Sequence, residues 1–198
     1  MILPVVVYGD PVLRKVGSEI DKNYENLNGL IQDMFETMYN SKGVGIAAPQ
    51  IGKAIRLFII DASPFAETDE EDEEDELSKE ERKLLEGFKK VFINPIILEE
   101  SGKEWKFNEG CLSIPKIRED VSRKENVHLE YYDENFKKHT EEFSGIAARI
   151  IQHEYDHIEG KLFIDRISPL RRKLLSGKLN DISKGKISTD YKIKVFKK

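Results

Sequence analysis

Apolar residues recur at helical spacing in residues 27–38. They occupy positions i, i+3, i+4 and i+7, a pattern typical of an amphipathic helix with one buried face. We therefore expect a helix from about Glu25 to Asn40. It cannot continue through residues 41–53, because SKGVGIAAPQIGK contains three glycines and a proline. The apolar positions are Leu27, Leu30, Ile31, Met34, Phe35 and Met38.

Four later segments have the patterns of β-strands. Residues 54–61 (AIRLFIID) and 91–98 (VFINPIIL) are short apolar runs typical of buried strands. Residues 103–115 (KEWKFNEGCLSIP) indicate a further strand that ends in a turn. Residues 126–143 contain two alternating runs around residues 133–135, which predicts a hairpin.

An insertion, residues 62–87, separates two of these strands. Its acidic run at 67–76 (ETDEEDEEDE) is too highly charged to pack in a core, so we expect it to be solvated. The following residues favour a short helix. Ser78 and Glu81 have the spacing of a capping box, and Gly87 can end the helix.

The last third of the chain contains another expected helix and a basic extension. Ile146, Ile150, His153 and His157 share one helical face, and Gly160 is placed to end that helix. Residues 171–198 contain ten Lys or Arg against two Asp, a net charge of +8. We expect this segment to begin as a helix whose cations face outward and whose apolar side chains pack on the domain. The packing residues would be Leu170, Leu174 and Leu175.

Composition narrows the class of protein. A chain of 198 residues with 39% hydrophobic content predicts one domain with an ordinary core. The formal charge is −5, and this mildly acidic total excludes a nucleic-acid binder that relies on bulk charge but not one with a local basic patch. Without the acidic run the charge would be +4. The single cysteine, Cys111, excludes an intramolecular disulfide and a cysteine-rich zinc site. The N-terminus has no basic signal-peptide region and no run approaches the ~18 apolar residues of a membrane span, so we expect a soluble, cytoplasmic protein.

The strongest chemical signal is the HExxH sequence at residues 153–157. On a helix, His153 and His157 lie on one face and can bind one metal ion, and Glu154 can act on water at that ion. The alternative is a pair of histidines that is merely exposed or packed in the core. A third ligand would favour the metal site, because catalytic zinc-type sites use three protein ligands and one open position.

Several residues compete as that third ligand. The metzincin pattern requires a histidine where this chain has Phe163, and no glutamate follows Glu159. His128 and His139 lie in the predicted hairpin and are expected to be solvated. Cys111 is the best candidate, because a thiolate suits a borderline-soft metal. The aspartates Asp165, Asp181 and Asp190 are not excluded.

Cys111 also has other interpretations. It stands between a glycine and a predicted turn in EGCLSIP, residues 109–115, which would direct the thiol into a cleft. A lone cysteine is by default a small buried hydrophobe, and a nucleophilic Cys/His pair is a sharper alternative. We favour the metal, because HExxH supplies two histidines and a glutamate where a thiol nucleophile needs one histidine.

A third motif occupies residues 43–52, GVGIAAPQIG. It satisfies the G-x-G-x-x-A dinucleotide pattern, but it follows a predicted helix and meets Pro49 instead of linking a strand to a helix, so that interpretation fails. Its glycines let another backbone approach closely, and Gln50 offers an amide donor to a developing oxyanion.

Together the three motifs GVGIAAPQIG, EGCLSIP and QHEYDHIEG resemble the signature motifs of the peptide deformylases, in the same order and spacing. The likeness extends from about Asp10 to Asp165. Small departures occur at Ile46 and Ile158, where leucine is common in the family. The insertion at 62–87 and the C-terminal extension lie outside the family core and touch no motif residue.

The resemblance implies an α+β fold in which antiparallel strands pack around a central helix carrying HExxH. It also implies an enzyme that removes the formyl group from the N-terminal formyl-methionine of new polypeptides. Residues 1–167 would form the catalytic domain, with the insertion, and residues 168–198 the basic C-terminal extension. The metal would be a single divalent ion, Fe²⁺ in the cell, with Ni²⁺, Co²⁺ or Zn²⁺ accepted in purified protein.

The resemblance also assigns roles to residues. The metal ligands would be Cys111, His153 and His157, with water in the fourth position. Glu154 would be the general base and then the acid. Gln50 and the N–H of Leu112 would hold the oxyanion. The peptide would lie extended beside Gly45 and Gly110. The methionine pocket would draw on Val44, Phe107, Ile146 and Ile150, and Glu109 would pair with Arg118 in support.

The resemblance also implies which partners the protein has, and other functions are alternatives to it. The expected partners are formyl-methionyl nascent peptides, with no membrane and no sequence-specific nucleic acid. Residues 171–198 are either a solubilising tail or a weak, salt-sensitive contact to the ribosome, which deletion from Ser168 would remove with little change in kcat. A metallopeptidase or another amidase, and a binding domain that keeps the motif as core, are the alternatives.

Overall fold

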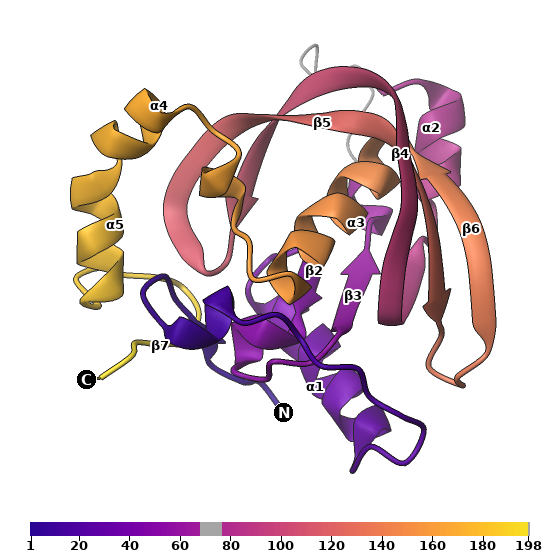
Figure 1. Cartoon of the computed structure of the whole chain (residues 1–198), viewed down its shortest axis with the longest axis horizontal. Helices are drawn as coiled ribbons and strands as arrows, with labels where there is room; N and C mark the ends of the chain where they lie inside the picture. Colours follow the sequence, from indigo (N-terminus) through magenta and orange to yellow (C-terminus); the bar gives the residue numbers. More distant parts are fainter. Residues whose placement is uncertain (68–76, 198) are drawn as a thin grey trace.

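A computed structural model of the chain describes residues 1–67 and 77–197 (Figure 1). Helix α1 (Leu27–Asn40) begins within two residues of the predicted start. All six apolar residues of the predicted stripe are buried, which confirms the helix and its inner face. The glycine-rich segment that follows leaves α1 and enters a sheet, because its first part extends as a strand and its second part forms a 3-10 turn at Ala48–Ile51.

The central structure is a five-stranded sheet in the order β2-β3-β4-β5-β6, and every neighbouring pair is antiparallel. The predicted hairpin is confirmed as β5 and β6, which pair from Asn126↔Ser144 to Tyr132↔Lys138. The strand expected at 54–61 begins at Leu57. The strands are β2 (Gly45–Ala47), β3 (Leu57–Asp61), β4 (Lys89–Cys111), β5 (Ile114–Tyr132) and β6 (Lys138–Ser144).

Strand β4 corrects the prediction of two separate strands at 91–98 and 103–115. The chain stays paired with β5 from Ile93 to Cys111, and shifts in register absorb the irregular residues between the two segments. One shift falls at Asn94 and Pro95, where Asn94 is left-handed and its side chain bonds to the main chain of Ile20. Such bulges bend a strand without ending it, so β4 and β5 curve over the rest of the molecule.

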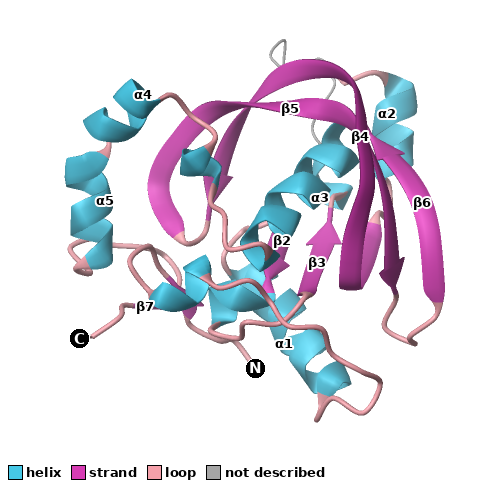
Figure 2. Cartoon of the chain, in the orientation of Figure 1, coloured by secondary structure: helices cyan, strands magenta, loops and turns pink. Residues whose placement is uncertain are grey.

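Helix α3 (Gly145–Ile158) lies inside this curve and contacts β2, β3, β5 and β6 (Figure 2). Its apolar residues, among them Ile146, Ile151 and Ile158, join the core between the helix and the sheet. Unlike an ordinary amphipathic helix, α3 also buries polar side chains on its other sides, so these side chains need partners inside the protein. Neither α3 nor any other helix in the described residues is long and apolar enough to cross a membrane.

The predicted insertion contains a short helix, α2 (Lys79–Leu85). Ser78 and Glu81 form the capping box, because each side chain accepts from the other's backbone N–H. This confirms the helix predicted after the acidic run. The predicted solvation of residues 67–76 concerns a segment of which only Glu67 belongs to the described residues.

The C-terminal extension forms α4 (Pro169–Leu174) and α5 (Ser176–Ser183). The packing prediction is right for Leu175, which is buried, and wrong for Leu170 and Leu174, which are 69% and 66% exposed. The chain bends between α4 and α5, so Leu179 and Ile182 of α5 are buried instead. A final strand, β7 (Ile193–Lys194), pairs in parallel with β1 (Val5–Val6) and joins the two ends of the chain.

Candidate metal centre

Three potential metal ligands meet where the end of β4 approaches α3. Cys111 is the last residue of β4, before the turn into β5, and His153 and His157 stand one helical turn apart. Their ligand atoms all lie within 4.8 Å of one another, and Cys111 Sγ is 3.3 Å from His157 Nε2. In residues 1–67 and 77–197, no aspartate and no other histidine joins this group.

The chemistry of these side chains fits a divalent metal ion. Burial acts to raise the pKa of the Cys111 thiol, but the opposite effect of the neighbouring His157 and His153 is larger. Together they lower this pKa to about 5. The sulfur is therefore a thiolate at neutral pH, the form that binds metals. One thiolate and two imidazoles are a donor set that Fe²⁺, Ni²⁺, Co²⁺ and Zn²⁺ accept.

Glu154 lies beside this group and forms no ion pair with a side chain in the described part of the protein. Its side chain is buried, and its Oε2 has no hydrogen-bond partner in the described residues. Burial raises the pKa of Glu154 to about 7, although the two histidines act to lower it. Gly45 makes the room, because a Cβ at that position would lie 2.6 Å from Glu154 Oε1. An unpaired carboxylate of this kind can exchange a proton near neutral pH.

Glu109 is the centre of a buried ion-pair network. Its carboxylate accepts hydrogen bonds from Arg123 at 2.7 and 2.9 Å, from Arg149 at 2.9 Å and from His153 Nδ1 at 2.9 Å. Arg123 also donates to Asp156 at 2.7 Å. Burial acts to raise the pKa of Glu109, but Arg123 and His153 hold it far below its usual value. The bond to His153 leaves Nε2 of that ring facing Cys111.

The predicted Glu109–Arg118 pair is wrong. Arg118 instead donates to Asn108, at 2.8 Å to the side chain and 2.5 Å to the backbone carbonyl. The reason is the register of β4 and β5, in which Arg118 is opposite Gly110. Side chains alternate along a strand, so Glu109 and Arg118 point to opposite faces of the sheet, whereas Arg123 shares the face of Glu109.

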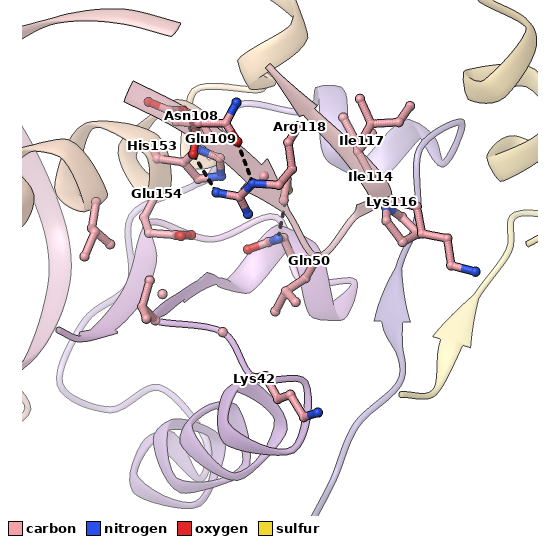
Figure 3. A pocket seen from close by; sticks show the side chains of 18 of the residues that line it. Lys42, Gln50, Asn108, Glu109, Ile114, Lys116, Ile117, Arg118, His153 and Glu154 are labelled. Carbon is pink, nitrogen blue, oxygen red and sulfur yellow. Dashed lines mark hydrogen bonds and ion pairs between the residues drawn. The ribbon is translucent and has the colours of Figure 1, made fainter. Parts of the chain in front are cut away.

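The two predicted oxyanion donors also reach this centre. The Gln50 amide nitrogen is 3.5 Å from Cys111 Sγ and 3.3 Å from Ser113 Oγ, while its oxygen accepts the N–H of Ala47 at 2.8 Å. The last bond fixes which end of the amide faces the centre. Leu112 lies next to Cys111 in the turn between β4 and β5. Figure 3 shows Gln50 and Glu154 directed toward the same part of the cleft.

A cleft of about 540 Å³ opens beside the metal centre. Of the seven residues predicted to bind substrate, six line it, and the exception is Ile146, which is buried in the core behind the cleft. Phe107 and Ile150 give the cleft an apolar wall near His153. The six are Val44, Gly45, Phe107, Glu109, Gly110 and Ile150.

Two features of the site are not among the residues predicted from the sequence. Arg149 donates a hydrogen bond to Glu109. The sequence feature that could have indicated this role is a cation within the apolar stripe of the helix, four residues before His153. Residues 188–191 of the C-terminal extension line the cleft. Nothing in their local sequence indicates this, because the contact depends on how the chain returns after α5.

Comparisons with known proteins point to one family. The sequence matches the polypeptide deformylase family over residues 2–173. A peptide deformylase of Christiangramia forsetii is 56% identical over 98% of this chain and 96% of the relative. One of Flavobacterium psychrophilum is 57% identical over 100% of this chain and 99% of the relative. A crystal structure of a peptide deformylase from Legionella pneumophila has a TM-score of 0.76 at 35% identity, covering 94% of this chain and 98% of that chain.

Replacing Cys111 with serine should remove most of the bound metal. A serine hydroxyl stays protonated at neutral pH and is a poor ligand for a borderline-soft ion. Elemental analysis of anaerobically purified Cys111→Ser should show far less metal than the wild type. His139→Ala serves as the control, because His139 pairs with Asp133 in the hairpin and should keep a full metal content. Equal metal in the serine variant would show that Cys111 is not a ligand.

Replacing Arg123 with methionine should destabilise the fold by about 3–5 kcal/mol, since it leaves Glu109 and Asp156 as buried carboxylates without their shared cation. Urea unfolding of metal-free protein measures this loss without a contribution from metal binding. Arg118→Met is the matched control and should change stability by less than about 1 kcal/mol, because Arg118 is exposed. Equal stability of the two variants would contradict a structural role for the network.

Proposed function

Because the chain belongs to the polypeptide deformylase family, we propose that the cleft at Cys111, His153 and His157 is the place where it acts on its substrate. Members of the family remove the formyl group from the N-terminal formyl-methionine of newly made polypeptides, and this chain is such an enzyme. The observation that carries the assignment of the site is the meeting of three metal-ligating side chains beside the buried carboxylate of Glu154.

We assign Cys111, His153 and His157 as the ligands of one divalent ion. When bound, the ion supplies a Lewis acid that makes water nucleophilic at neutral pH. We propose Fe²⁺ as the native ion, with Ni²⁺, Co²⁺ or Zn²⁺ able to use the same ligands. The support is the mixed nitrogen and sulfur donor set and the hydrogen bond from His153 to Glu109, which orients that ring.

Glu154 is the proposed general base and acid. Its carboxylate accepts a proton from the attacking water as oxygen bonds to the formyl carbon. When the C–N bond breaks, the same carboxyl delivers the proton to the departing methionine amine, and formate leaves. Burial acts to raise the pKa of Glu154, which helps the carboxylate to hold the proton between the two transfers.

Gln50 and the backbone N–H of Leu112 are the proposed donors to the oxyanion. The Gln50 amide is held by Ala47, so its NH₂ group stays turned toward Cys111 and Ser113. Donors fixed in this way stabilise charge in the transition state without first having to reorganise.

The substrate peptide is proposed to lie extended beside Gly45 and Gly110. The methionine side chain would enter a pocket formed by Val44, Phe107 and Ile150, with Ile146 supporting that wall from the core. Glu109 also lines the cleft, but its carboxylate is occupied by three donors, two guanidinium groups and the His153 ring. We therefore propose that it serves the site by orienting His153 and not by binding the peptide.

We also propose how the chain is divided into a catalytic domain and an extension. Contacts of α3 with four strands support an α+β fold in which antiparallel strands pack around a central helix carrying HExxH. We propose residues 1–167 as the catalytic domain and 168–198 as its basic extension, attached through the buried Leu175, Leu179 and Ile182. A cytoplasmic location follows from the substrate, because formylated N-termini first arise where polypeptides are made.

The same extension is proposed to make a weak contact with the ribosome. The fold reduces the charge available for it, since Arg171 pairs with Glu119 at 2.6 Å and Arg172 with Asp165 at 3.3 Å. Lys173 and other exposed lysines remain for RNA phosphate.

Glu154→Gln should abolish formate release from formyl-Met-Ala while metal stays bound, because glutamine keeps the shape of the side chain but cannot accept a proton. The assay uses anaerobic protein loaded with ferrous iron, with Glu142→Gln, an exposed residue of β6, as the matched control. Near wild-type kcat in Glu154→Gln would refute the general-base assignment. In the same assay, acetyl-Met-Ala should be a poor substrate, and equal turnover of both peptides would favour a broader amidase.

Charge reversal tests the ribosome contact better than the deletion from Ser168. That deletion would also remove buried side chains of α5, so it would disturb the fold. The double variant Lys173→Glu/Lys178→Glu should reduce cosedimentation with ribosomes at low salt and leave kcat on a short peptide unchanged. Lys53→Glu/Lys137→Glu makes the same charge change elsewhere on the surface. Equal cosedimentation of both double variants would leave the extension as a solvated surface.

A further inference from the structure

The C-terminal segment returns from α5 to the active-site cleft. Ser188, Thr189, Asp190 and Tyr191 line the cleft together with residues of the three motifs. Pairing of β7 with β1 fixes this path, because Val5 N–H donates to the carbonyl of Lys192 at 2.9 Å. The end of the chain is therefore a built part of the cleft wall.

Tyr191 makes the most specific contact of this segment. Its hydroxyl donates a hydrogen bond to the carbonyl oxygen of Leu112 at 2.8 Å. The two residues are partly buried and pack against the same core cluster, so the tyrosine ring is fixed as well as its hydroxyl. The contact joins residues 79 positions apart in the sequence.

The turn after Cys111 needs such support. Leu112 and Ser113 lie between the end of β4 and the start of β5, outside the strand pairing. The N–H of Tyr8 holds the carbonyl of Ser113 at 2.8 Å, and the Gln50 amide bonds to the Ser113 hydroxyl at 3.3 Å. Tyr191 supplies the corresponding anchor for the carbonyl of Leu112.

We propose that Tyr191 is a positioning residue for deformylation, because its hydroxyl anchors the Leu112 main chain and so keeps the Leu112 N–H directed at the oxygen of the formyl group. This inference rests on the oxyanion role proposed above for Leu112. Loss of a whole oxyanion donor lowers kcat by about 10²- to 10³-fold, so a donor that is only loosened should cost less. An interaction that strengthens in the transition state affects kcat more than KM.

The test is Tyr191→Phe, which removes the hydroxyl and keeps the ring. With formyl-Met-Ala, we expect kcat per bound metal to fall about tenfold while KM changes by less than about twofold. Metal content and the urea midpoint should equal those of the wild type, which separates positioning from a loss of folded enzyme. Tyr132→Phe is the matched control, because Tyr132 does not line the cleft and should leave kcat unchanged.

Two kinetic results would overturn the inference. One is a kcat for Tyr191→Phe within about twofold of the wild type, and the other is a higher KM with unchanged kcat, which would make Tyr191 only a wall that contacts substrate. If the wild type itself releases no formate, the proposed function fails instead.

A second measurement does not depend on activity. The amide of Ser113 shares a peptide group with the Leu112 carbonyl, so its resonance in zinc-loaded protein should shift in Tyr191→Phe and stay in place in Tyr132→Phe. An unshifted Ser113 resonance in Tyr191→Phe would overturn the anchor.

Discussion

The buried carboxylate of Glu109 is the interaction on which the rest of the site depends. Removing a charged group from water costs several kcal/mol unless it is paired, and α3 carries Arg149 and Asp156 into the core together with His157. Glu109 on β4 accepts from Arg149 and His153 of α3 and from Arg123 of β5. The docking of the helix, the pairing of the long strands and the orientation of one metal ligand are therefore coupled through one side chain.

A second constraint acts on the turn that presents Cys111. The turn lies at the end of the β4–β5 ladder, where strand pairing alone does not fix the backbone, and segments from the two ends of the chain hold it. Tyr8 continues from β1, and Tyr191 precedes β7. Because β1 and β7 pair with each other, both anchors are attached to the same two-stranded sheet. The site is therefore completed by parts of the chain that carry no motif.

Local sequence patterns predicted the helices, strands and motif residues, because these depend mainly on neighbouring residues. Periodicity predicted α1, the β5–β6 hairpin and the HExxH helix, and the HExxH spacing together with the family resemblance indicated the three candidate ligands that the fold brings together. The partner of Glu109 depends on the register of two long strands, and a shift of one residue reverses the face of every side chain. The exposure of Leu170 and Leu174 depends on the bend before α5, and the contact of Tyr191 depends on the return of the chain to β1. No local pattern contains this information.

The two glutamates of the site show how environment divides their roles. Glu109 accepts from the guanidinium groups of Arg123 and Arg149 and from the His153 ring, and these bonds keep it ionised, so it orients its neighbours and does not take up a proton near neutral pH. Glu154 is equally buried, yet its Oε2 has no hydrogen-bond partner in the described residues, and burial brings its pKa to about 7. Gly45 leaves room for this carboxylate, because it adds neither charge nor bulk beside it.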